Sequence, residues 1–206
     1  MENERRKGES RMSVTFRLDI DKVIATAIYI ASRNIPELTP GKLFKLMFLA
    51  EKYHLVHYGR PITGDRYDAM NDGPVPSFTY DLFKRQILRR PFTEPGRRLA
   101  AALDVIRSGK LPQFKALHSF DPDQLSKSDI LALDKTIQKF GLKTFEELSD
   151  ITHAMVAYDK AWKSKGMFRK SSPMKFEDFF EDETDAIEAR DEMVENYHLH
   201  RSFAKP

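Results

Sequence analysis

Apolar residues recur along much of the chain with the spacing of helices. After Asp19 they fall one helical turn apart, which predicts an amphipathic helix, at Ile20, Val23, Ile24, Ala27, Ile28 and Ala31. Residues 42–58, KLFKLMFLAEKYHLVHY, are apolar almost all round, so we expect them to form the central, buried helix. Thr39 and Pro40 suit its N-cap and first turn, and Gly59 followed by Pro61 suits its end.

Residues 61–77 have the short β-compatible runs and turn residues of a hairpin. The Gly64-Asp65 pair between RPIT and RYDAM predicts a type II′ hairpin turn. A second sharp turn is expected at residues 71–74, Asn-Asp-Gly-Pro, because glycine permits positive φ and proline fixes the next φ. Ser77 is expected to cap a helix running to about Arg89.

Four further helices are predicted after this region. One covers residues 97–109, and the next is capped near Ser128 and ends at Gly141. Thr144 and Glu147 form a capping-box pattern for a helix running to about Lys165. Ser172-Pro173 marks a boundary before an acidic helix.

The predicted fold class is therefore mainly α: a compact helical domain with one small β-hairpin inserted between helices, plus a C-terminal acidic helix. The predicted divisions are a disordered charged leader (1–15), the domain (16–170) and the acidic helical extension (171–206).

The composition narrows the class of protein. The chain has 206 residues and no cysteine, which excludes disulfides, thiolate metal sites and cysteine nucleophiles. It contains no apolar run of the roughly 18–20 residues that span a membrane and no apolar stretch of a secretory signal at its start. We expect a cytoplasmic protein without a membrane partner.

Charge is distributed unevenly. Residues 176–195 contain ten acidic residues and one arginine, a net −9, so the rest of the chain carries +12. Six positive charges lie in one stretch: Lys84, Arg85, Arg89, Arg90, Arg97 and Arg98. Such a basic stripe is either a nucleic-acid footprint or a solvated helix face, and we favour the solvated face.

Catalytic motifs are scarce. The chain has no P-loop, dinucleotide-binding glycine motif, nucleophile elbow or H-E-x-x-H motif. No lysine has Asp or Glu two positions before it, which disfavours one class of metal-dependent nuclease. Two E-x-x-H pairs, Glu51/His54 and Glu195/His198, have the spacing of helical di-metal ligands, but the additional glutamates of such a site are missing. We therefore expect no catalytic residue, metal or cofactor.

The segment from Leu43 to Lys84 carries a more specific combination. It joins a Leu-x-Lys-Leu helix (Leu43, Lys45, Leu46) to Tyr-Gly-Arg-Pro (Tyr58, Gly59, Arg60, Pro61), a Gly-Pro-Val turn (Gly73, Pro74, Val75) and a helix containing Tyr80. A second segment has Leu148, Ser149, Thr152, His153, Ala161 and Trp162 in order. Together they resemble the Panacea domain of SocA-like antitoxins over roughly residues 16–170.

The resemblance implies a binding protein rather than an enzyme. Family members bind and neutralise a toxin encoded by a neighbouring gene, and many lie on phages and prophages. The expected partner is therefore a cognate toxin. The candidate contact residues are Tyr67, Met70, Asp72, Gly73, Pro74, Val75, Tyr80, His153 and Trp162. Alternatively, Gly73, Pro74 and Val75 serve only to turn the chain, and His153 and Trp162 serve only to pack the core.

Three other functions remain open at this stage. A protease adaptor would present the toxin for degradation. A DNA-binding regulator of its own operon would use the basic stripe, and is less favoured because no helix-turn-helix is evident. A metalloenzyme would rest on the E-x-x-H pairs alone.

Overall fold

The computed structural model describes residues 14–87, 93–107, 109–118, 121–181 and 187–203. Its α-helices are α1 (Ile20–Ala31), α2 (Pro40–Tyr58), α3 (Ser77–Leu82), α4 (Glu94–Ala102), α5 (Lys127–Phe140), α6 (Phe145–His153), α7 (Val156–Lys163) and α8 (Ile187–Phe203). Its strands are β1 (Tyr67–Met70), β2 (Gly73–Pro76), β3 (Leu103–Ile106), β4 (Gln113–Ala116) and β5 (Ser172–Pro173). A π-helical turn, Phe83–Ile87, follows α3, and 3-10 turns cover Pro122–Gln124 and Phe176–Phe180. The mainly α fold is confirmed.

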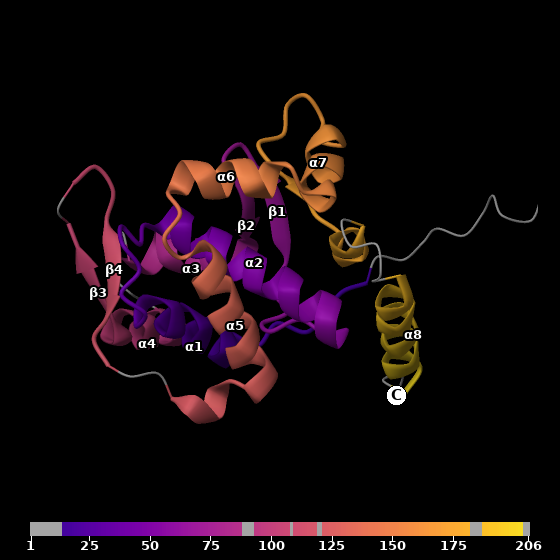
Figure 1. The fold of residues 1–206 in the computed structure, drawn as a ribbon, viewed down its shortest axis with the longest axis horizontal. Helices are drawn as coiled ribbons and strands as arrows, with labels where there is room; N and C mark the ends of the chain where they lie inside the picture. Colours follow the sequence, from indigo (N-terminus) through magenta and orange to yellow (C-terminus); the bar gives the residue numbers. More distant parts are fainter. Residues whose placement is uncertain (1–13, 88–92, 108, 119–120, 182–186, 204–206) are drawn as a thin grey trace, which may run out of the picture.

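Helix α2 is the centre of the molecule. It crosses the middle of the fold, with α1, α5, α6 and the first hairpin around it (Figure 1). Every residue from Lys42 to Lys52 is buried, including Leu43, Leu46 and Phe48, each 0% exposed. Thr39 Oγ1 accepts from the Lys42 N–H at 3.4 Å, and Gly59 ends the helix in the left-handed region at φ 63°. The predicted buried helix and both of its ends are confirmed.

The first hairpin turns within residues 71–74, where the second sharp turn was predicted, and not at Gly64-Asp65. Strands β1 and β2 are antiparallel, with Met70 opposite Gly73, so Asn71 and Asp72 form the turn. Strand β5 pairs with the other side of β1, which makes β2 an edge strand. Edge strands tolerate proline, and β2 contains two, Pro74 and Pro76.

The hairpin turn predicted at Gly64-Asp65 is wrong because Asp65 has distant partners. Its carboxylate accepts from the Phe78 N–H (3.0 Å), the Thr79 N–H (2.9 Å) and the Thr79 hydroxyl (2.8 Å). Asp65 thus satisfies the free N–H groups at the start of α3. Ser77, the predicted cap, instead donates its hydroxyl to Asp68 at 2.8 Å.

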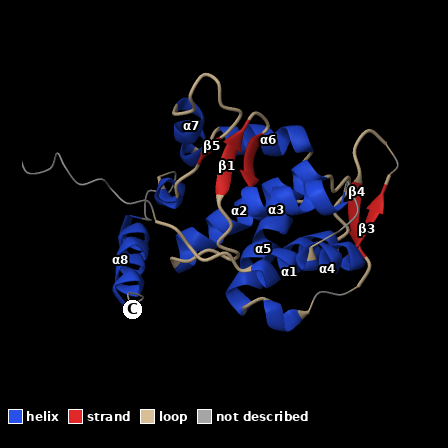
Figure 2. Ribbon diagram, turned by 180° about the vertical axis from the view of Figure 1, so that it is seen from behind, coloured by secondary structure: helices blue, strands red, loops and turns tan. Residues whose placement is uncertain are grey.

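A second hairpin replaces part of a predicted helix. The helix expected over 97–109 ends at Ala102, and β3 pairs with β4 in antiparallel register from Leu103 to Ile106. Val105 and Ile106 are β-branched residues suited to strands, and Gly109 has φ 141° in the connection. This hairpin lies apart from the sheet of β1, β2 and β5, at the end of the molecule opposite α8 (Figure 2).

The helix predicted from residue 144 to about 165 is two helices. Thr144 and Glu147 form the capping box of α6 as predicted. The chain then breaks at Met155, whose backbone is extended at φ −77° and ψ 138°, before α7 begins. This break allows α7 to pack beside β1 and β5.

The acidic segment packs on the core. Phe176, Phe179 and Phe180 are buried, and Phe179 contacts the ring of Phe48 with centroids 5.3 Å apart. The segment is not one continuous helix, because β5 and a 3-10 turn precede α8. Met193 of α8 is 1% exposed. The division at residue 171 stays a prediction, and residues 1–13 of the predicted leader lie outside the described residues.

Candidate functional site

Two sequence segments far apart in the chain meet at the tip of the first hairpin. Gly73 has φ 106°, and a Cβ built there would lie 2.7 Å from Lys45 Nζ and 3.0 Å from Thr152 Oγ1. Ser149 of α6 donates its hydroxyl to the Asp72 carbonyl at 2.7 Å. The hairpin tip is therefore fixed against α2 and α6, and only glycine allows this close approach.

A groove opens beside this tip, and we call it the hairpin groove. Its volume is about 570 Å³. Its apolar wall consists of Phe44, Met70, Val75, Tyr80, Phe145 and Trp162. Its charged side chains are Lys45, Lys165, Arg169 and Lys170, with Asp72 as the acidic member. Four cations and one carboxylate around an apolar wall favour a ligand with both acidic and apolar groups.

The structure brings most of the predicted contact residues to this groove. Met70, Asp72, Val75, Tyr80 and Trp162 line it. Gly73 and Pro74 lie at its edge through their contacts with Lys45. Their role as partner contacts stays a prediction.

His153 lies behind the groove rather than in its wall. Its ring stacks on Tyr158 at 4.5 Å between centroids, and Tyr158 stacks on Trp162 at 5.9 Å. Its Nε2 atom is buried and has no hydrogen-bond partner among the described residues. Burial, and then the charge of Lys45, lower the pKa of His153. The neutral His153 ring thus supports Trp162 from behind, through the stacked ring of Tyr158.

Tyr67 lies in the interior. It is 2% exposed and packs against the rings of Phe48 and Phe179, at 5.3 Å and 6.0 Å. Burial raises its pKa well above the ordinary value. In this conformation Tyr67 stabilises the core and does not reach the surface of the groove.

The sequence analysis missed a loop beside the groove. Residues 164–171, which we call the basic loop, connect α7 to β5, and carry Met167 and Phe168 at 89% and 97% exposure. Lys165 Nζ lies 4.6 Å from the centre of the Trp162 ring. The available signal was an adjacent Met-Phe pair among lysines and arginines between a helix end and Ser-Pro. Exposed large apolar side chains on a charged loop are typical of binding surfaces.

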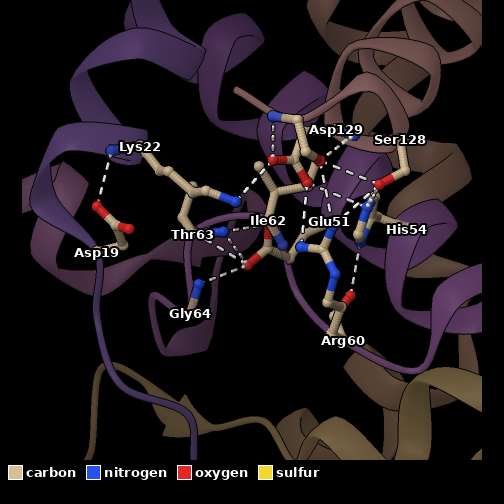
Figure 3. Close-up of polar contacts among 11 residues, drawn as sticks. Asp19, Lys22, Glu51, His54, Arg60, Ile62, Thr63, Gly64, Ser128 and Asp129 are labelled. Carbon is tan, nitrogen blue, oxygen red and sulfur yellow. Dashed lines mark hydrogen bonds and ion pairs between the residues drawn. The ribbon is translucent and has the colours of Figure 1, made fainter. Parts of the chain in front are cut away.

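Glu51 and His54 are directed to different partners. Glu51 turns toward the loop after α2, where it accepts hydrogen bonds from the backbone N–H groups of Ile62, Thr63 and Gly64 at 3.1–3.2 Å (Figure 3). Burial raises the pKa of Glu51 to about 7 against the effect of these bonds. Among the described residues, no three histidine or acidic side chains are grouped as metal ligands.

His54 belongs to a separate cluster around Asp129. Its Nδ1 donates to the Arg60 carbonyl at 2.7 Å, and its Nε2 lies 3.1 Å from Asp129 Oδ1 (Figure 3). Asp129 also accepts from Lys22 Nζ at 2.6 Å and from the Ser126 N–H at 2.9 Å. Burial alone would raise the pKa of Asp129, but bonds from His54 and Lys22 outweigh it and hold the pKa well below the usual range. The cluster joins α1, α2 and α5 and is structural.

The described part of the basic stripe is partly neutralised. Arg98 lies 2.6 Å from Asp21 and 3.7 Å from Glu94, and Arg85 lies 3.7 Å from Asp81. Arg89 and Arg90 lie outside the described residues. These ion pairs favour the solvated-face interpretation of the stripe.

A second groove of about 450 Å³ lies between α2 and α5. It contains Leu49, Tyr53, Val56 and Phe140 beside Lys52, Lys135 and Lys139. None of the predicted contact residues lines it.

No helix in the described ranges is long and apolar enough to cross a membrane.

Comparison with known families identifies the family of this chain. The family described as antitoxin SocA-like, Panacea domain, matches residues 43–163. This range includes α2, the first hairpin, α6 and α7, and hence most of the hairpin groove. No curated protein and no solved structure matches the chain.

Proposed function

The chain belongs to the Panacea domain family of SocA-like antitoxins, and we propose that it neutralises a cognate toxin in the cytoplasm by binding it directly through the hairpin groove and the basic loop. Family membership supports a role in a toxin–antitoxin system and a toxin as the partner. The gene next to that of this chain is the first candidate to encode that toxin.

The convergence at the groove is the observation that carries this proposal. The two segments that carry the family resemblance meet at the hairpin tip, where Gly73, Lys45 and Thr152 are in close contact. The groove beside the tip has an apolar wall and a basic rim. A fixed tip of this kind lowers the entropic cost of binding, because little backbone must be ordered.

Exposed aromatic and thioether side chains supply the second part of the surface. Phe168 and Met167 stand out from the basic loop, and burying each against a toxin would contribute about 1.5–3 kcal/mol to association. We propose as contacts Met70, Asp72, Val75, Tyr80 and Trp162 of the groove with Met167 and Phe168 of the loop. Gly73 and Pro74 shape the tip, and Tyr67 and His153 support it from within.

Neutralisation by this mechanism is steric. The bound antitoxin covers the active or substrate-binding surface of the toxin, so no catalytic group of its own is required. The complex must be stable at cellular concentrations, which a central cluster of apolar anchors with a charged rim can provide.

A rescue experiment tests the proposal. The neighbouring gene is expressed inducibly with wild-type protein, with the double variant Met167→Ser/Phe168→Ser, or with the control Leu111→Ser. Leu111 is an exposed apolar residue, 59% exposed, in the connection between β3 and β4. We expect wild type and the control to restore growth and co-purify with the toxin, and the double variant to fold normally but fail in both.

The same experiment separates occlusion from delivery to a protease. In a host that lacks its main ATP-dependent cytoplasmic proteases, occlusion predicts that growth rescue persists while the toxin accumulates in the complex. An adaptor would lose rescue in that host. A neighbouring product that is harmless and does not bind would contradict the proposed pair.

A further inference from the structure

Lys45 is a buried lysine without a strong partner. Lys45 is 1% exposed and lies at the floor of the hairpin groove. The ammonium has three donors, but the acceptor it reaches among the described residues is the Pro74 carbonyl at 3.5 Å. The Phe145 ring lies 5.6 Å away, which adds a weak cation–π contact.

Lys42, on the same helix, shows what a satisfied buried lysine looks like here. It is 3% exposed, and its Nζ donates to the Pro36 carbonyl at 2.7 Å. Burial lowers the pKa of both lysines, to about 8 for Lys45. Lys45 therefore lacks a close hydrogen-bond acceptor and could still bind an anion, whereas Lys42 already has a close acceptor.

The surroundings of Lys45 are arranged to admit an anion. Lys165, Arg169 and Lys170 add positive charge along the rim, and Asp72 lies near enough to act on Lys45 electrostatically but forms no ion pair with it in the described structure. The apolar side of the groove, which includes Phe44 and Trp162, can pack the carbon atoms of the same ligand. A short acidic side chain flanked by apolar ones matches both features.

We propose that the hairpin groove binds an acidic side chain of the toxin, whose carboxylate pairs with Lys45, while neighbouring apolar residues of the toxin pack on the aromatic wall. This inference deepens the proposed function, because it gives the chemistry of the toxin segment that docks. The cation that is poorly satisfied in the free protein gains its ion pair on binding, so Lys45 would contribute to affinity more than to folding.

Two lysine variants give a direct test. Lys45→Met and the control Lys42→Met are compared with wild type for Tm and for Kd toward the neighbouring gene product, used as a catalytically inactive mutant. We expect Lys45→Met to keep or raise Tm and to bind at least about tenfold more weakly, the loss expected for one charged hydrogen bond. Lys42→Met should lower Tm and leave Kd unchanged. Wild-type affinity in Lys45→Met, or a loss of affinity that comes only with a lower Tm, would overturn the proposal.

A second arm does not require an identified toxin. A displayed library of random twelve-residue peptides is selected on the immobilised full-length protein. We expect enrichment of Asp or Glu flanked by apolar residues, with binding lost in Lys45→Met. Selected peptides without an acidic preference would overturn the inference, as would their displacement by millimolar inorganic phosphate, which would assign the site to a free anion. If the neighbouring product fails to bind wild type, the proposed pair fails, while the library arm still decides the role of Lys45.

Discussion

Replacement of Asp129 by asparagine should destabilise the fold markedly. The Asp129 side chain is 0% exposed, and its Oδ1 faces His54 and Arg60 while its Oδ2 faces Lys22 and the Ser126 N–H. An asparagine has the same shape but only one acceptor oxygen. Whichever way the amide is turned, its NH₂ group faces at least one donor, Arg60 on one side or Lys22 and the Ser126 N–H on the other.

The size of the effect follows from which donors can reach water. Lys22 and Arg60 are 21% and 45% exposed and can turn to solvent, whereas His54 is 0% exposed and cannot. The Nε2 atom of His54 keeps a neutral partner, the Ser128 hydroxyl at 3.1 Å. Hydrogen bonds to a charged group are worth about 1.5–3 kcal/mol each, and the bonds to residue 129 lose this charge assistance, so we expect a loss of about 3 kcal/mol. For a chain of this size, that corresponds to a decrease in Tm of roughly 10 °C.

The assay is urea denaturation of wild type, Asp129→Asn and the control Asp134→Asn. Asp134 lies on the same helix, is 51% exposed and accepts from the Tyr29 hydroxyl, so its replacement should cost less than about 1 kcal/mol. Because the pKa of Asp129 is depressed in the folded state, its contribution is present above the unfolded pKa of about 4 and is lost as pH falls below it. The difference between wild type and Asp129→Asn should narrow there.

A double-mutant cycle with His54→Gln completes the test. Since His54 and Asp129 are in contact, the two losses should not add, and the coupling should be about 1–3 kcal/mol. A loss below about 1 kcal/mol in Asp129→Asn, or strictly additive losses, would refute the buried cluster described here.

Two further predictions concern the hairpin tip and the loop after α2. Gly73→Ala should lower the free energy of unfolding by about 2–4 kcal/mol, because the new methyl group would lie 2.7 Å from Lys45 Nζ at a positive φ. Gly166→Ala, whose methyl group would meet nothing within 4 Å, should change it by less than about 0.5 kcal/mol in the same denaturation assay. Because burial raises the pKa of Glu51 from 4.5 to about 7, the folded state holds a proton that the unfolded state releases, and wild-type stability should fall by about 3 kcal/mol as pH rises from 5 to 8. Glu51→Gln should lack this fall, and equal pH profiles for the two proteins would exclude the buried titration.

Features that depend on neighbouring residues in the chain could be predicted from the sequence. The Thr39-Pro40 start and Gly59 end of α2 involve groups within one turn, and so does the capping box at Thr144. The all-round apolar composition of α2 likewise implies burial wherever the other helices lie. These predictions needed no knowledge of the tertiary structure.

Predictions failed where the deciding partner was distant in sequence. Asp65 resembled a turn residue, but its hydrogen bonds are with Phe78 and Thr79. The chain after Ala102 leaves the helix because a second strand, β4, is available to pair with it.

In the candidate site, too, some features could be predicted from the sequence and others depended on distant parts of the chain. Most of the predicted contact residues lie together in the hairpin groove, namely Met70, Asp72, Val75, Tyr80 and Trp162. The rest of its wall and its basic residues were not among the predicted contacts. Tyr67 was placed among them because it adjoins a turn, yet the alternation of strand β1 points it into the core. Lys45 could not be assigned to the groove from the sequence, because its position there depends on the packing of α2 against the hairpin tip.

Hydrogen–deuterium exchange of the protein alone and in complex with the neighbouring gene product would locate the toxin-binding surface. We expect slower exchange on binding at residues 70–75 and in the basic loop, with little change in α8 and at the groove between α2 and α5. Protection confined to α8 or to the α2–α5 groove, with the hairpin tip and the basic loop unchanged, would contradict that expectation.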